Sequence, residues 1–517
     1  MKKIIFSLSI IVLILAVVFY IVNASTKKDD KTAQNQTSLQ QYWPTGDWRT
    51  STPEEQGMDS GILADMINSI KGSGKSVNSI TVIRNGYLVN ETYFYPYQKG
   101  LKHFMNSCTK SFVSALVGMS LDDGHIKSVN DKVLDYFPDQ NIANVDRRKQ
   151  NLKIRNLLTM TTGLDWDFST NTSTNKMLQS QDWTQFTLDQ PMKEEPGHTF
   201  IYCNGASHLL SAIVQKTTGK SLTELATEKF KPMGIKDIYW SSSPENVSSG
   251  YTGLYMLPDD AAKVGYLYLN KGNWNGKQLI PEKWVEESTK MQVKADWTPL
   301  FPGYGYMWWI NRFGGYAALG QGGDYIFVVP KLDLVVVFTG GIYNLNDVFY
   351  PGELMEKYIV PAVKSDAPLE ANLTALESLN KALDMVQTPS PEPAGSLPEI
   401  AKKISGKPFA MDDSTILTLS FKDNECTIEQ GSNYMFTVGL DNVYRTVDAG
   451  NSVGGLLDRI HMALKGRWLD QKTLEITMQD LEDGFETVYI AHIENDRMEV
   501  KIKSNIYPEI TNTGKLK

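Results

Sequence analysis

The chain has 517 residues, and a composition with 41% hydrophobic and 21% charged residues excludes a protein that is disordered throughout. Its 51 Lys and Arg residues are outnumbered by 59 Asp and Glu residues, and the net charge of -8 argues against a nucleic-acid partner. Three cysteines, Cys108, Cys203 and Cys426, are too few and too scattered for a disulfide framework or a four-ligand zinc site.

The amino terminus predicts a location outside the cytoplasm. After a basic start, residues 4–22 are apolar and uncharged, and as a helix they would span roughly 28 Å, about the thickness of a bilayer core. Residues 1–24 therefore indicate a signal anchor or a signal peptide. The length favours an anchor, and cleavage after Ala24 stays open. The polar residues 25–42 are the expected tether.

The next segment mixes helical and strand patterns. Apolar residues at helical spacing predict a helix that has Asp59 or Ser60 as its cap and ends at Gly72. Two β-rich runs around an Asn-Gly pair predict a hairpin over residues 79–94, and a second hairpin is expected over 325–340. Residues 103–300 are dominated by helical and loop patterns. One sheet must therefore join strands that are distant in the sequence, as in an α+β domain.

These patterns divide the folded part of the chain into three segments. The α+β domain is expected over residues 43–365. An amphipathic helix and a proline-rich linker occupy residues 366–400. Residues 401–517 contain short alternating runs separated by Asn, Asp and Gly, which predict an all-β module, either a small barrel or a sandwich.

Ser107 and Lys110 suggest nucleophilic chemistry. They lie three residues apart at the start of a strongly apolar helix, so a hydroxyl and an amine share one helix face. Serine attacks when a base removes its proton, and lysine is such a base only if its pKa falls from about 10.4. The same spacing recurs at Ser173 and Ser378, and the alternative is a helix-capping serine beside a surface lysine.

Two later segments have polar residues in contexts that are typical of a site. Tyr202 and Asn204 follow a Pro-Gly turn and precede a buried helix, which places them on a packed loop. Gln321-Gly322-Gly323-Asp324 leads into a strand, and glycines there would let a ligand approach the edge of a sheet.

The order and context of these three motifs resemble the serine-dependent β-lactamase and penicillin-binding-protein superfamily. Within it they are most similar to the branch of class C β-lactamase-like esterases and 6-aminohexanoate-dimer hydrolases. The resemblance covers residues 45–365 and rests on NSCTKSF, on the block with YCNG and HLLSAI, and on the block with YGYMWW, LGQGGDYIFVVP and DLVVVFTG. It implies a β-lactamase/transpeptidase-like domain with an antiparallel sheet and a helical region.

The resemblance also implies roles for the first two motifs. Ser107 would be the acylated nucleophile, Lys110 its general base, and Tyr202 a proton shuttle to the leaving group. Asn204 would bind the carbonyl or amide of the substrate. No metal or organic cofactor is implied.

The third motif, Gln321-Gly322-Gly323, departs from the family pattern. Penicillin-recognising members usually have Lys or His where Gln321 stands, and glutamine supplies no charge for a carboxylate. Unless Arg312 or another cation substitutes, a neutral ester or amide is the expected substrate. The resemblance further implies an oxyanion hole formed by the backbone N–H groups of Ser107 and Asp324, because a tetrahedral intermediate needs such donors.

Other residues near the motifs have structural alternatives. His198 and His208 show no metal-ligand spacing, and structural roles are expected for them. We expect Cys108 and Cys203 to be buried free thiols, although a disulfide between them stays open. Two further sets remain undecided between a cleft wall and ordinary structure: Trp308 with Trp309, and Asp165 with Trp166 and Asp167.

Together these features predict an extracytoplasmic, membrane-tethered serine hydrolase that acts through an acyl-enzyme on a small-molecule or peptide substrate. Two alternatives stay open, a penicillin-binding-like D,D-peptidase and a non-catalytic receptor for a cell-envelope peptide. The pattern leaves the oligomeric state open.

Overall fold

The computed structural model describes residues 42–517 except 394, 432–433 and 449–460. The chain divides into residues 1–43 and a larger unit of residues 44–517, and the fold below is that of the larger unit. The predicted anchor or signal segment and the tether up to residue 41 lie outside the described residues. Within the part described, no helix combines the length and the apolar character needed to cross a bilayer.

An eight-stranded antiparallel sheet forms the centre of the first domain, in the order β2-β1-β13-β12-β11-β10-β9-β8. Strand β1 pairs with β13, and Val82 lies opposite Val336. The prediction that one sheet joins sequence-distant strands is therefore confirmed. The strands are β1 (Val77–Arg84), β2 (Tyr87–Tyr93), β8 (Val293–Thr298), β9 (Phe301–Tyr304), β10 (Trp309–Ile310), β11 (Tyr316–Gly320), β12 (Asp324–Val329) and β13 (Leu334–Gly340).

Both predicted hairpins are present in this sheet. Asn85 and Gly86 join β1 to β2 with φ angles of 52° and 74°, the left-handed conformation that a tight two-residue turn requires. Strands β12 and β13 are joined by a short 3-10 turn, Pro330–Leu332. All residues of β12 and β13 are buried, as expected for β-branched and aromatic runs in the middle of a sheet.

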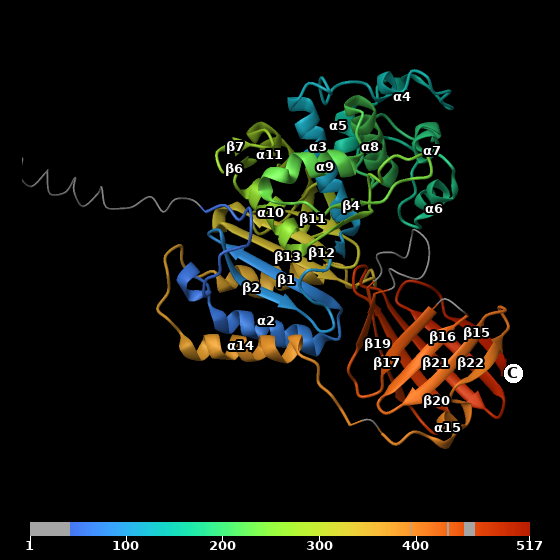
Figure 1. Ribbon diagram of the computed structural model, residues 1–517. Coiled ribbons are helices and arrows are strands. Elements are labelled where there is room, and N and C mark those ends of the chain that lie inside the picture. Colours follow the sequence, from blue (N-terminus) through green and yellow to red (C-terminus); the bar gives the residue numbers. More distant parts are fainter. Residues whose placement is uncertain (1–41, 394, 432–433, 449–460) are drawn as a thin grey trace, which may run out of the picture. The chain divides into compact units, whose positions relative to one another are not determined.

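Helices cover both faces of the sheet (Figure 1). Helices α2 (Ser60–Ser73) and α14 (Leu373–Gln387) lie side by side, and α10 (Pro258–Leu269) packs on β1, β12 and β13. The Asp59 side chain caps α2 by accepting hydrogen bonds from two backbone N–H groups. The predicted end at Gly72 is wrong by two residues, because the glycine that ends the helix in the left-handed conformation is Gly74.

The segment between β2 and β8 is mainly helical, as predicted. Its centre is α3 (Thr109–Asp122), which is buried along almost its whole length and packs on α8 (Asn204–Thr218). The other helices are α4 (Arg147–Gln150), α5 (Ile154–Leu158), α6 (Thr172–Gln179), α7 (Trp183–Asp189), α9 (Leu222–Phe230) and α11 (Glu282–Thr289). Short strands in this segment are β3 (His103–Phe104), β4 (Tyr239–Trp240), β5 (Leu254–Met256), β6 (Asn273–Trp274) and β7 (Lys277–Gln278), and α12 (Tyr350–Leu354) and α13 (Val360–Ala362) follow β13.

In its described residues the carboxy-terminal module is all β apart from the short helix α15 (Glu399–Ile404). Its ten strands form one sheet, and a parallel contact between β17 and β19 closes that sheet into a barrel. The predicted α+β domain followed by an all-β module is confirmed. The strands are β14 (Lys407–Met411), β15 (Ile416–Lys422), β16 (Glu425–Gln430), β17 (Tyr434–Gly439), β18 (Arg445–Asp448), β19 (His461–Trp468), β20 (Thr473–Asp480), β21 (Glu486–Glu494), β22 (Arg497–Ser504) and β23 (Ile510–Leu516).

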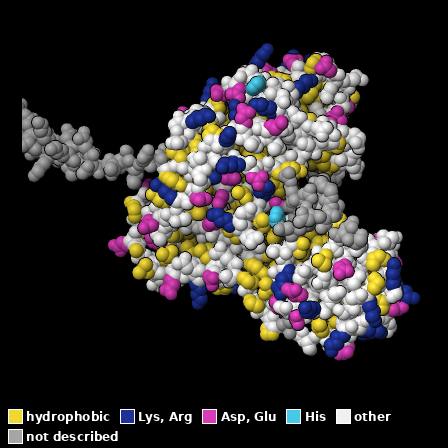
Figure 2. Space-filling model, in the orientation of Figure 1, with side chains coloured by type: hydrophobic (Ala, Val, Ile, Leu, Met, Phe, Trp, Pro, Cys, Tyr) yellow, Lys and Arg dark blue, Asp and Glu magenta, His cyan; other side chains and the backbone are white. Residues whose placement is uncertain are grey.

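The charged side chains are mixed on the surface. On the face shown in Figure 2, Lys and Arg side chains alternate with Asp and Glu side chains, and neither sign forms a broad field. This distribution agrees with the small net charge and with the absence of a basic stripe in the sequence.

Candidate active site

Ser107 lies on a tight turn directly before α3. The 3-10 turn Asn106–Cys108 leads into the helix at Thr109, so Ser107 is half-buried at the amino-terminal end of α3. Asn106 has φ of 43°, a left-handed conformation that costs a non-glycine residue about 1–3 kcal/mol. Its side-chain amide donates to Asp324 Oδ2 at 2.7 Å. The buried Asp324 therefore holds the turn that presents the serine.

Lys110 lies one turn further along, against Ser107. Its Nζ is 2.9 Å from Ser107 Oγ and 2.8 Å from the backbone oxygen of Tyr251. The side chain is 1% exposed, and in the part of the chain that is described it makes no ion pair. Burial lowers the pKa of the Lys110 ammonium well below its usual range. The structure thus combines a serine hydroxyl with a lysine that favours its neutral form.

The Tyr202 ring covers the same lysine. Lys110 Nζ is 4.7 Å from the ring centroid, and the ring stacks on Trp309 at 5.9 Å. Burial raises the pKa of Tyr202 above its ordinary value, and a hydrogen bond with the Ser107 side chain partly opposes that rise. The phenol therefore keeps its proton at neutral pH and lies within reach of the serine oxygen.

Asn204 is the first residue of α8 and is also buried. Its side-chain amide donates to Thr174 Oγ1 at 3.1 Å, whereas its Oδ1 has no hydrogen-bond partner among the described residues. A buried acceptor without a partner is costly, so this oxygen is suited to accept a hydrogen bond from a water molecule or a ligand.

The third motif packs against the Ser107 turn. At Gly322, where φ is 93°, an added Cβ would lie 3.1 Å from Asn106 Nδ2 and 3.3 Å from Gly340 O, so a larger residue would disturb the turn. Gln321 is exposed, whereas Gly323 is buried. The Asp324 carboxyl is fully buried on Asn106, and this burial raises its pKa well above the ordinary value. The Asp324 side chain itself therefore does not face solvent.

A cavity of about 650 Å³ lies beside Tyr202. The segment Asp165–Asp167, an undecided prediction above, contributes to its lining. Phe168 and Trp297 complete an aromatic wall, with ring centroids 4.9 and 5.9 Å from that of Tyr202. Sequence reasoning missed both aromatic residues because neither stands next to a motif.

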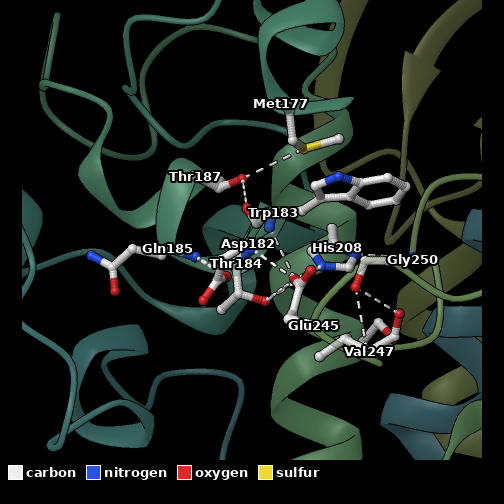
Figure 3. A network of polar contacts seen from close by, with 12 residues as sticks. Met177, Asp182, Trp183, Thr184, Gln185, Thr187, His208, Glu245, Val247 and Gly250 are labelled. Atoms are coloured by element: carbon white, nitrogen blue, oxygen red, sulfur yellow. Dashed lines mark hydrogen bonds and ion pairs between the residues drawn. The ribbon is translucent and has the colours of Figure 1, made fainter. Parts of the chain in front are cut away.

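Figure 3 shows a network of polar contacts around His208 and Glu245. Glu245 Oε1 is 3.0 Å from His208 Nε2 and accepts hydrogen bonds from the backbone N–H groups of Trp183 and Thr184, at the start of α7. Burial alone would raise the pKa of Glu245, but hydrogen bonds, chiefly from His208, outweigh it and lower the pKa to about 2. The carboxylate is thus ionised and holds His208 in place.

The network continues toward the backbone oxygen that contacts Lys110. His208 Nδ1 accepts a hydrogen bond from Gly250 N at 3.5 Å, and the Trp183 ring packs on both His208 and Tyr251. Gly250 directly precedes Tyr251, whose carbonyl accepts from Lys110. The structural role expected for His208 is therefore to support the segment that orients the lysine.

The comparison with protein families agrees with this arrangement. The beta-lactamase family model matches residues 72–340, which is more than half of the chain and includes all three motifs. The chain belongs to the beta-lactamase family. This is a family of serine hydrolases with a common fold, and the resemblance drawn from the sequence is confirmed.

Two relatives in this family each align with half of the chain. An uncharacterised protein of Alkalihalophilus pseudofirmus is 24% identical over 300 residues, which are 50% of this chain and 82% of the relative. The 6-aminohexanoate-dimer hydrolase of Paenarthrobacter ureafaciens is 22% identical over 285 residues, 50% of this chain and 71% of the relative.

A solved structure shares the fold. It comes from Bacillus anthracis and is assigned as a 6-aminohexanoate-dimer hydrolase homologue. Its TM-score is 0.50 at 19% identity, over 62% of this chain and 89% of that chain.

The structure also places the remaining residues that the sequence analysis of this beta-lactamase-family chain considered. Cys108 and Cys203 are free and buried, as expected. Trp308 packs on Tyr268 in the core, and only its neighbour Trp309 touches Tyr202. Two residues lie apart from the cluster: His198 is exposed, and Arg312 forms a paired contact with Glu356 at 2.7 and 2.5 Å.

Proposed function

We propose that this protein is an extracytoplasmic serine hydrolase that acts through an acyl-enzyme on a neutral ester or amide. The observation that supports it most strongly is the dry environment of Lys110. Lys110 is buried, has no ion-pair partner among the described residues and lies 2.9 Å from a serine oxygen, which is the setting needed to accept the serine proton.

In the first step, Ser107 Oγ attacks the carbonyl carbon of the substrate and its proton passes to Lys110 Nζ. The carbonyl becomes an oxyanion, which backbone N–H groups of Ser107 and Asp324 stabilise. When this intermediate collapses, the bond to the leaving alcohol or amine breaks. The leaving group takes the proton that Lys110 had accepted, relayed through the Tyr202 hydroxyl, and Lys110 is neutral again. The product is an ester between Ser107 and the acyl group.

In the second step, water attacks the acyl carbon and gives its proton to the same base. The bond between that carbon and Ser107 Oγ then breaks, the serine regains a proton, and the acid is released. The ring of Tyr202 and its aromatic neighbours limit the access of water to the base, and this keeps Lys110 neutral between cycles.

The preference for an uncharged substrate follows from the charge state of the two residues considered for binding a carboxylate, Gln321 and Arg312. Gln321 has no charge, and Arg312 is already paired with Glu356. The Asn204 Oδ1 atom, which lacks a partner, is suited to accept the N–H of an amide substrate. The name of one relative, a 6-aminohexanoate-dimer hydrolase, is in keeping with hydrolysis.

The location is supported by the sequence at the amino terminus. Residues 4–22 have the length and apolar character of a membrane anchor or a signal peptide. Protease accessibility of the folded domain in intact cells tests this part of the proposal, and protection of the domain until the cells are lysed would contradict it.

Labelling with a fluorophosphonate probe tests the nucleophile. We expect the purified chain to take up one probe at Ser107 and Ser107→Ala to take up none. Ser378→Ala is a matched control, because Ser378 has the same spacing to a lysine but lies exposed on α14, and it should label normally. Equal labelling of Ser107→Ala and the native chain would contradict the assignment.

Turnover distinguishes the hydrolase from the two alternatives. Steady release of nitrophenol from a short-chain nitrophenyl ester is expected. A lasting penicillin adduct without ester turnover would favour the D,D-peptidase or the non-catalytic receptor instead.

A further inference from the structure

The interior of the carboxy-terminal barrel has two unlike halves. Toward the end that is covered by α15, the inward-pointing side chains are tightly packed, and Phe409, Leu474 and Ile493 are fully buried. Toward the other end, a cavity of about 230 Å³ remains among the strands. The side chains of the described strands therefore leave part of the barrel interior unfilled.

The wall of this cavity is hydrocarbon. Its lining combines fully buried residues such as Leu419 and Ile476 with half-buried ones. The half-buried residues point inward from two groups of strands, β15 to β17 and β20 to β22: Leu417, Ile428, Phe436, Met478, Tyr489 and Ile502. Water in such a cavity would find few hydrogen-bond partners. Removal of apolar surface from water is favourable by about 25 cal/mol of free energy per Å². An apolar ligand would supply that burial.

Apart from the Tyr489 phenol, the polar groups of the described lining lie toward one rim of the barrel. Thr415 directly precedes β15, Gln430 ends β16, Asn512 lies near the start of β23, and the one charged residue of the described lining is Asp413. The Asp413 carboxylate accepts hydrogen bonds from Thr415 Oγ1 at 2.6 Å and from Asn512 Nδ2 at 2.8 Å. A negative charge at the rim and the lack of lysine or arginine in the described lining disfavour a ligand that ends in a carboxylate.

We propose that the barrel binds one uncharged aliphatic chain of about eight or nine carbons, with its polar end at the rim near Asp413. The length follows from volume, because a cavity of ~150 Å³ with a similar lining holds benzene, which has six carbons. A closed barrel of about eight strands is already wide enough to hold one small ligand, and this barrel has ten strands in its described residues. This site is separate from the Ser107 cluster and does not depend on the proposed hydrolase activity.

Calorimetric titration of the purified chain with primary alcohols tests the proposal. Affinity should rise about fourfold with each added carbon from 1-butanol, in line with the transfer of one methylene, and should level off near eight or nine carbons. Octanoate should bind at least tenfold more weakly than 1-octanol. Affinity that is independent of chain length, or equal binding of octanoate and 1-octanol, would overturn the proposal.

Two cavity-filling variants test whether the ligand binds inside the barrel. Ala491→Trp fills the cavity from β21, and Ile502→Trp fills it from its less buried end should the first variant fail to fold. Either variant should weaken 1-octanol binding at least tenfold. His492→Trp is the control, because His492 lies next to Ala491 but is exposed. Unchanged binding in a folded cavity-filling variant, or an equal loss in the control, would contradict the assignment.

Discussion

The two enclosed sites of this protein are both lined by apolar and aromatic side chains, but they differ in what that lining surrounds. Around Ser107 it encloses a lysine, a phenol and the unpaired oxygen of Asn204. In the barrel it surrounds a cavity, and most of the polar groups of the described lining lie at the rim. Exclusion of water changes protonation where a titratable group is present, whereas elsewhere it favours the binding of an apolar molecule.

The largest expected effect breaks the first site and leaves the second intact. Lys110→Met removes the base and should lower the rate of Ser107 acylation by roughly 10⁴-fold or more, as losses of a nucleophile or its base do in other serine hydrolases. Rates of fluorophosphonate labelling measure this effect. The same variant should bind 1-octanol as the native chain does, and a parallel loss of both properties would show that the two sites are not independent.

A smaller loss is expected when the phenol is removed. Tyr202→Phe keeps the ring over Lys110 but has no proton to transfer, so kcat for a nitrophenyl ester should fall by about 10²- to 10³-fold, the range of general acid catalysis. Burst kinetics can locate the loss in acylation or deacylation. An unchanged kcat would remove Tyr202 from the proton path.

The network around His208 and Glu245 should influence the pKa of Lys110. His208→Ala removes the acceptor for Gly250 N and loosens the segment with the Tyr251 carbonyl, which admits water to Lys110 and raises its pKa. We expect kcat/KM to fall about tenfold near pH 7 and its acidic limb to move to higher pH. His208→Gln should restore part of the activity, and His198→Ala is the exposed control. An equal loss at every pH would indicate a structural role alone.

The smallest effect concerns stability. Because burial holds the pKa of Lys110 below its value in the unfolded chain, the unfolded state binds one more proton between those two pKa values, and stability rises with pH across that window. Lys110→Met lacks this dependence. It should therefore be more stable than the native chain near neutral pH, and the difference should shrink as pH approaches about 10.4. Thermal unfolding from pH 7 to 10 measures it, and a difference that grows with pH would contradict the sign.

The sequence predicted those parts of the molecule that depend on neighbours along the chain. The turn at Asn85 and Gly86 follows from local conformational preference, and Ser107 with Lys110 follows from helical spacing. The Tyr251 carbonyl was missed because it reaches the lysine from more than a hundred residues away and no side-chain motif marks it. The barrel cavity was missed for a related reason, since alternating strands look alike whether or not their inward side chains meet.

The pH dependence of Ser107 labelling tests the central claim most directly, since that claim is that Lys110 is neutral in the folded protein. With fluorophosphonate in excess, the rate of Ser107 labelling should rise with pH, and the midpoint of that rise should lie well below the ordinary lysine pKa of about 10.4. Lys110→Met should show no such rise. A native rate that increases only near pH 10, or one that Lys110→Met retains, would contradict it.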